Sequence, residues 1–299
     1  MNDQLLWNST REAWSALAPH YEPVIHKLNE ETGLQSQAWG LLLAALTFEP
    51  EQTTPAHLMI RVPYTSAEKY LDRLRAIARQ ELMEEVEAGK FILTANGRSE
   101  TIRFIEEVRA AMSAADPLSY ADSMRLAILL DHLVSACRDT PPPPDTWSIN
   151  LSYKLMPEPD PPLPYTEQAI TCLAAYRDDA HLAAWQNTGL AATTLEALTL
   201  LWRGEADSLS ALIEKLEPRG HESVIYESAL EELRQRNYVT GDNSSLQVSL
   251  TGIQFREAIE DQTNRFFFRP WNQLEEAEKQ ELEGLLTNLR NGLRAGSAA

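Results

Sequence analysis

The stretch "TSAEKYLDRLRAIARQELMEEVEAGKFILT", residues 65–94, passes from a helical pattern to a strand pattern. It begins with Thr65 and has Glu68 three residues later, which is the spacing of a capping box at a helix start. The apolar positions that follow share one helical face: Leu71, Leu74, Ile77 and Ala78. Apolar residues on both sides of the Ala88-Gly89 turn then indicate a short hairpin. The stretch therefore predicts a helix followed by a β-hairpin.

Two shorter helices are expected before this stretch, the first over residues 35–46. The second lies in "TTPAHLMIRV", where Thr53 or Thr54 can cap the helix. Pro55 is favoured at its first position, and Pro63 ends it. Three helices followed by a hairpin form the winged-helix arrangement, a variant of the helix-turn-helix.

The same order recurs in the second half of the chain. "TGLQSQAWGLLLAAL" at residues 32–46 is echoed by "TGLAATTLEALTLLW" at 188–202, an offset of 156. Later landmarks keep this spacing: "LT" at 93–94 recurs at 250–251, and residues 126–133 recur in pattern at 282–289. A register held over so many residues predicts a tandem duplication. The alternative is that two helical segments share a common apolar spacing.

The expected architecture is mainly α with small β-wings, as two winged-helix modules that form a pseudo-dimer. The modules cover residues 1–138 and 166–299, and a proline-rich linker covers 139–165. The linker is expected to be stiff and extended, with "TWSINLSYKL" as an edge strand. The expected helices outside the heads are 10–29 (interrupted by Pro19 and Pro23), 98–114, 119–137, 166–186, 252–266 and 274–293.

The composition restricts the class of protein. The formal net charge is −18, and 43% of the residues are apolar, enough to build packed cores. No apolar run approaches the length of a membrane-spanning helix, and the N-terminus does not have the order of a signal peptide. Two cysteines fit a reducing compartment, so a cytoplasmic protein is expected. No phosphate loop or nucleophile motif is present, and neither enzymatic activity nor a cofactor is expected.

In its pattern the chain resembles the MarR-like winged helix-turn-helix regulators. The resemblance is carried by residues 41–98 and 195–252, and by the closing "LTGIQFREAIEDQTNRFFFRPWNQL". It implies a transcriptional regulator that binds double-stranded DNA through one helix of each module, with the hairpin as a wing. It also implies a small aromatic effector held between the DNA-binding and dimerisation regions. Two copies in one chain would supply the twofold arrangement that two subunits normally supply.

Charge distinguishes the two candidate recognition helices. Residues 65–80 carry four basic and two acidic side chains, a net of +2, whereas residues 221–237 carry two basic and four acidic ones, a net of −2. The wing of the first module holds Glu81, Glu84, Glu85 and Glu87, which disfavours phosphate contact. The candidate DNA-binding residues are Arg61, Thr65, Ser66, Lys69, Arg73 and Lys90 in the first module and His221, Ser223 and Tyr226 in the second. The alternative is a scaffold that has lost DNA binding and recognises a protein partner, or a small hydrophobic ligand between the copies.

Two further motifs have competing interpretations. In "RDDAHLAAW", residues 177–185, Asp178 and His181 could share a helix face as metal ligands, but no partner motif is present. No metal site is therefore predicted, and Arg177 and the acids are expected to pair between the copies. In "FFFRPW", residues 266–271, Phe267 and Trp271 are expected to lie in the core.

Overall fold

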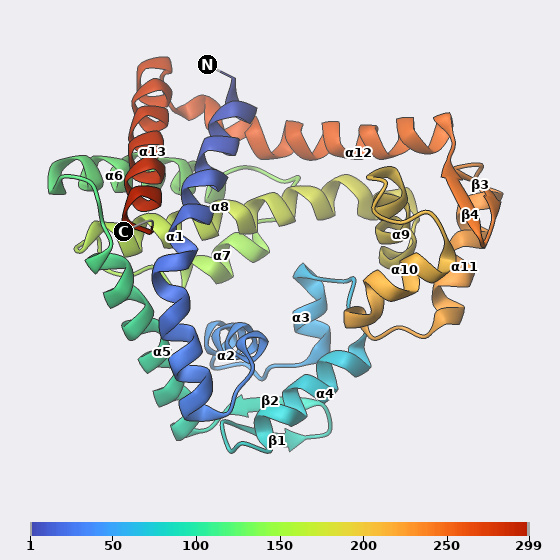
Figure 1. The fold of residues 1–299 in the computed structure, drawn as a ribbon, viewed down its shortest axis with the longest axis horizontal. Coiled ribbons are helices and arrows are strands. Elements are labelled where there is room, and N and C mark those ends of the chain that lie inside the picture. Colours follow the sequence, from blue (N-terminus) through green and yellow to red (C-terminus); the bar gives the residue numbers. More distant parts are fainter. Residues whose placement is uncertain (1, 298–299) are drawn as a thin grey trace.

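The computed structural model describes residues 2–297, which form a mainly helical fold with two small antiparallel sheets (Figure 1). The α-helices of the first half are α1 (Asp3–Thr32), α2 (Ser36–Phe48), α3 (Pro55–Arg61), α4 (Ala67–Ala78), α5 (Ala95–Ala114), α6 (Tyr120–Arg138) and α7 (Trp147–Tyr153). Those of the second half are α8 (Pro162–Trp185), α9 (Ala192–Trp202), α10 (Leu209–Leu216), α11 (Ser223–Gln235), α12 (Leu250–Phe268) and α13 (Glu276–Ser297). The strands are β1 (Met83–Glu87), β2 (Lys90–Leu93), β3 (Val239–Asp242) and β4 (Ser245–Val248). Short 3-10 turns follow α8, α10 and α12.

Each half contains three helices followed by a hairpin. We call residues 36–93, from α2 to β2, the first head, and residues 192–248, from α9 to β4, the second head. In Figure 1 the first head lies at the bottom and the second at the right. Both hairpins pair antiparallel, Met83 with Leu93 in one and Val239 with Val248 in the other, as the sequence predicted.

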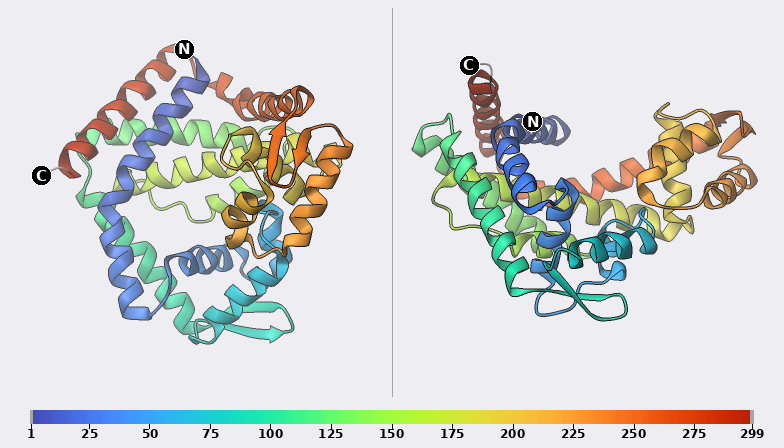
Figure 2. Two further views of the ribbon diagram at one scale, coloured as in Figure 1. Left: turned by 45° about the vertical axis from the view of Figure 1, so that its right-hand side comes forward. Right: turned by 60° about the horizontal axis from the view of Figure 1, so that its bottom comes forward.

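The long helices α1, α5, α6, α8, α12 and α13 form a body, and its packing is reciprocal. The first long helix of one half packs against the last long helix of the other: α1 against α13, and α8 against α6 (Figure 2). One hydrophobic core therefore contains residues of both halves, and it also includes the apolar side chains of the first head. The second head has a separate cluster around Leu212, Tyr226 and Leu230.

Of the two predicted helix caps, one is confirmed and one is wrong. Thr54 caps α3 by accepting a hydrogen bond from the His57 amide at 3.1 Å, and Pro55 is the first helical residue. The start predicted for α4 was wrong by one residue. Its N-cap is Ser66, which accepts from the Lys69 amide at 3.0 Å, whereas Thr65 precedes the cap and is buried.

Two expectations about proline-rich segments were wrong. Helix α1 runs without interruption past Pro19 and Pro23. Both prolines are exposed, so water can hydrate the carbonyl groups they free, while Leu17 and Leu28 are buried on the opposite side. "TWSINLSYKL" is not an edge strand, because its centre forms α7.

Phe267 is completely buried in the shared core, with ring centroids 4.9 Å from Trp7 and 5.3 Å from Trp271. The expected burial of Phe267 and Trp271 is thus confirmed. We predict that Phe267→Ala lowers the free energy of unfolding by about 3–5 kcal/mol, because it removes a large ring from a packed core. Urea denaturation measures this loss. Ile102→Ala, at a side chain that is 40% exposed, is the control and should cost far less. Equal losses in the two variants would contradict the shared core.

Candidate functional site

The N-terminal end of α4 contacts the second head. The Ser66 amide donates to the Arg219 carbonyl at 2.9 Å, and its hydroxyl donates to the Gly220 carbonyl at 3.0 Å. From the other side, Nε2 of His221 donates to the Tyr64 carbonyl at 2.9 Å. These bonds join the residues before α4 to those before α11. We call them, with the contacts of Lys69 and Arg73 described next, the inter-head contact.

Two basic residues of α4 complete this contact. The Arg73 guanidinium donates to the Pro218 carbonyl at 2.9 Å. Gly220 has a φ of +71°, and a Cβ atom there would lie 2.7 Å from the Cβ of Lys69. Glycine is therefore required at position 220, both for its backbone conformation and for the close approach of Lys69.

Arg219 supports the contact from within the second head. Its guanidinium pairs with Glu196 at 2.6 Å, donates to the Thr65 hydroxyl at 3.4 Å, and lies 5.7 Å from the centre of the Tyr64 ring. Burial raises the pKa of Glu196, and Arg219 opposes this shift. Sequence analysis missed Arg219, whose one visible signal was its place before the glycine that ends α10.

The structure thus brings five of the predicted DNA-binding residues together in one intramolecular contact: Thr65, Ser66, Lys69, Arg73 and His221. Thr65 is only 2% exposed, so a duplex cannot reach its side chain in this conformation. Tyr226 is completely buried in the second head and donates to the Leu216 carbonyl at 3.4 Å, so its prediction as a DNA contact was wrong. Ser223 is exposed at the start of α11, away from these bonds.

Three further cations of the first head, Arg61, Arg75 and Lys90, are paired with carboxylates. Arg61 pairs with Asp178 at 2.8 Å, and Lys90 pairs with Glu87 at 2.6 Å. Arg75 makes a two-pronged contact with Glu85, each distance 3.1 Å, and this hydrogen bonding lowers the pKa of Glu85. The acidic wing therefore neutralises positive charge of its own head.

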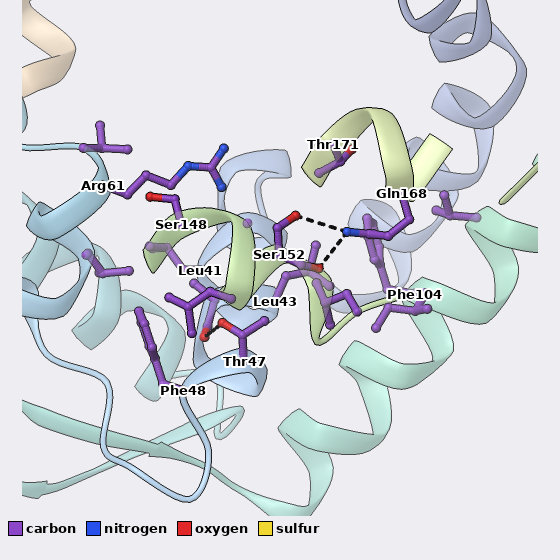
Figure 3. A pocket seen from close by; sticks show the side chains of 18 of the residues that line it. Leu41, Leu43, Thr47, Phe48, Arg61, Phe104, Ser148, Ser152, Gln168 and Thr171 are labelled. Atoms are coloured by element: carbon purple, nitrogen blue, oxygen red, sulfur yellow. Dashed lines mark hydrogen bonds between the residues drawn. The ribbon is translucent and has the colours of Figure 1, made fainter. Parts of the chain in front are cut away.

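A cavity of about 590 Å³ lies between the first head and helices α1, α5, α7 and α8 (Figure 3). Its walls come from α1, α2, α3 and α5, from Tyr70 of α4, and from α7 and α8 of the following segment. The lining is mostly apolar and includes Leu41, Phe48, Leu58, Phe104, Met112 and Trp147. This volume is typical of a small-molecule site.

Polar side chains at the base of the cavity hold α7 in place. Gln168 donates to the Ser152 carbonyl at 2.9 Å and to its hydroxyl at 3.2 Å, as the dashed lines in Figure 3 show. Asp179 accepts from the amides of Ser148 at 2.9 Å and Ile149 at 3.1 Å. A carboxylate from α8 thus satisfies the amides at the start of α7, which explains why this proline-flanked segment is a helix.

The segment of residues 177–185 pairs between the two halves only through Asp178, because Arg177 pairs within the second half. Arg177 contacts Glu260 and Asn264 on α12, and Asp178 pairs with Arg61 on α3. His181 lies 3.3 Å from the Thr263 hydroxyl, and burial lowers its pKa to about 4. Within residues 2–297, no group of three or more side chains suited to a metal ion was found.

These elements define a mainly helical protein of the helix-turn-helix class. A model of a helix-turn-helix family matches residues 106–299, more than half of the chain, and the chain therefore belongs to this family. Such families are in general DNA-binding regulators, and membership supports this general class. The match includes the whole second head, whereas the first head lies outside it.

The comparisons with other individual proteins add no relative. No curated protein and no solved structure matches the chain. Among the helices of residues 2–297, none has the length and apolar character needed to cross a membrane.

The Asp179 carboxyl should make stability depend on pH. Its side chain is 5% exposed, and burial raises its pKa from 3.8 to about 6. The native state therefore keeps a proton that the unfolded state has already lost, so stability falls as pH rises from about 4 to 6. We predict that this fall is smaller by about 3 kcal/mol in Asp179→Asn than in the wild type. Urea denaturation across this range measures it, and parallel pH profiles would refute it.

Proposed function

We propose that the protein is a MarR-like transcriptional regulator with two winged heads, arisen by tandem duplication, that binds double-stranded DNA through the first head. The proposal places it in the cytoplasm and involves no catalytic step and no cofactor. The conformation described above is then a closed state, in which the inter-head contact occupies the DNA-binding residues of α4. A small aromatic effector in the cavity would control the opening. The observation that carries the proposal is that α4, which makes the inter-head contact, also lines the cavity through Tyr70.

The reciprocal packing of the body supports a pseudo-dimer. A twofold arrangement requires that a contact between two elements be repeated by their equivalents, and the pairs α1–α13 and α8–α6 fulfil this. Arg125 binds Glu281 through distances of 2.9 and 2.6 Å, and these positions differ by the repeat offset of 156. Equivalent positions that meet in this way lie near a twofold axis. In a dimer of identical chains the same position would bring two like charges together.

The spacing of DNA grooves supports a closed state. Two recognition helices that enter successive major grooves lie about 34–36 Å apart. Here the N-cap residue of α4 is hydrogen-bonded to residues 219 and 220, just before the Glu222 N-cap of α11. The two helix starts cannot occupy separate grooves while these bonds persist. The second head has its own core, and Leu195 of α9 packs on Trp185 of α8 and Ile259 of α12, so the head would move together with the adjoining ends of α8 and α12.

The cavity is connected to this contact through a short path. Arg61, Val62 and Tyr70 line the cavity, and the chain from Val62 leads through Tyr64 to Ser66. The Tyr70 hydroxyl donates to the Val62 carbonyl at 3.3 Å, which ties α4 to the end of α3. A ligand that displaces α3 therefore also displaces the start of α4. An effector in the cavity would therefore interact differently with the closed and the open conformation, as control by an effector requires.

A reversible crosslink tests the closed state. We predict that the double variant Lys69→Cys, Gly220→Cys forms a disulfide, because the two Cβ positions lie within reach of one after a small shift. The native Cys137 and Cys172 are buried, so they compete poorly for it. The oxidised variant should bind duplexes selected from random DNA at least about tenfold more weakly than the same protein after reduction, because it cannot open.

The comparison is internal to one protein, and the two single variants control for the loss of Lys69 and for strain at position 220. Equal DNA affinity of the oxidised and reduced forms would refute the closed state. Absence of salt-dependent DNA binding by the wild type and by the reduced variant at low salt would refute the proposed function itself.

Loosening the contact from the second head should have the opposite effect. We predict that His221→Ala raises DNA affinity by about two- to tenfold, because it removes one hydrogen bond that holds the heads together and leaves α4 intact. A salt series of duplex binding measures the change. Ser228→Ala, at an exposed position of α11, the helix that follows His221, is the control. Reduced affinity in His221→Ala would instead indicate that His221 contacts DNA.

One observation favours a second candidate function, the recognition of a protein partner. On α11, Val224 and Ile225 are 54% and 41% exposed, next to the exposed acids Glu222 and Glu227. Apolar side chains among carboxylates suit a basic protein surface better than DNA. If the second head has this role, Val224→Ser with Ile225→Ser should leave DNA binding unchanged and abolish co-purification of a basic partner.

A further inference from the structure

The cavity contains a carboxyl group that forms no direct ion pair among residues 2–297, although the charge of Arg109 acts on it from a distance. Glu167, on α8, lines the cavity, and its Oε1 accepts from the Trp14 indole and the Thr171 hydroxyl, each at 3.1 Å. Both donors are neutral. Within residues 2–297, no hydrogen bond reaches Oε2 and no ion pair forms with Glu167. The other acid of the lining, Asp178, is already paired with Arg61.

We propose that the cavity binds an apolar molecule carrying one protonated amine, whose ammonium group donates to Oε2 of Glu167. The inference rests on the proposed function only in treating the cavity as the effector site. The apolar part of the ligand lies among Leu41, Phe104 and Met112. A charge-assisted hydrogen bond in a mostly apolar cavity is stronger than a neutral one, which gives the site selectivity for amines.

The surroundings of Glu167 favour a cation over an anion. Arg109 also lines the cavity, but its guanidinium is already engaged by the Leu155 carbonyl. Tyr21 adds an aromatic ring on the α1 side of the cavity. Burial raises the pKa of Glu167 and so disfavours an unpaired carboxylate in this site. A bound ammonium ion offsets this by pairing with the carboxylate, and any proton held by the carboxyl is released to solvent on binding.

Among the groups around Glu167, Tyr21 and Cys172 do not change charge between about pH 4 and 7, whereas burial raises the pKa of Asp178, which is paired with Arg61. The pKa of Tyr21 is raised to about 12 and that of Cys172 to about 11, chiefly by burial. Arg109 stays charged over this range. His57 lines the cavity from α3, and a neutral probe controls for its effect. The affinity for an amine should therefore rise with pH as Glu167 ionises, while the affinity for a neutral molecule should not.

Three probes with one skeleton test the proposal by calorimetry, without DNA: 4-phenylbutylamine, 4-phenylbutanol and 4-phenylbutyric acid. The wild type should bind the amine at least about tenfold more tightly than the alcohol near pH 7, and the acid most weakly. Glu167→Gln should bind the amine and the alcohol equally. Glu22→Gln, at an exposed acid of α1, is the matched control and should keep the preference.

Retained binding of the alcohol shows that Glu167→Gln is folded. If this variant does not fold, the pH dependence of amine and alcohol binding to the wild type still tests the proposal. Amine affinity that rises between about pH 4 and 7, beside a flat profile for the alcohol, supports the site, and parallel profiles overturn it. Tightest binding of the acid would also overturn it and place recognition at Arg109. None of these outcomes depends on DNA binding, so failure here is distinguishable from failure of the proposed function.

Discussion

The packing of each half's first helix on the other half's last helix is the constraint on which the rest of the structure depends. Because α1 lies against α13 and α8 against α6, neither half encloses a complete core by itself. The body fixes the heads close enough for α4 to reach the loop before α11. It also places α8, which begins the second half, against α3 of the first head, where α8 lines the cavity. The inter-head contact and the cavity both follow from this exchange of helices.

Local signals in the sequence predicted the elements whose causes are local. The cap at Thr54, the hairpin at Ala88-Gly89 and the burial of Phe267 and Trp271 depend on neighbouring residues or on periodicity, and they were correct. Helix α7 was missed because the group that satisfies its first amides, Asp179, lies about 30 residues away in sequence. No pattern within a proline-rich segment reveals a cap supplied by another helix.

The residues of the candidate site were predictable only in part, again because local patterns in the sequence do not reveal tertiary partners. Spacing and charge located Ser66, Lys69 and Arg73 at the start of the correct helix, but a helix's charge does not identify its partner. Ser66 and Arg73 donate to the backbone carbonyls of residues 218–220, and a carbonyl carries no side-chain signal. The unpaired carboxyl of Glu167 was equally invisible, because exposed glutamates are common and only tertiary packing reveals a buried one.

A single chain with two copies of a module can do what two identical subunits cannot. In a symmetric dimer every substitution appears in both subunits, so a residue near the twofold axis contacts a copy of itself. Within one chain, Arg125 and Glu281 carry opposite charges, and the N-cap of α4 is Ser66 whereas that of α11 is Glu222. The first head shares the core of the body, and the second has its own. In the proposed pseudo-dimer the two heads therefore have different roles. The first head couples the cavity to DNA, and the second head supplies the loop that blocks α4.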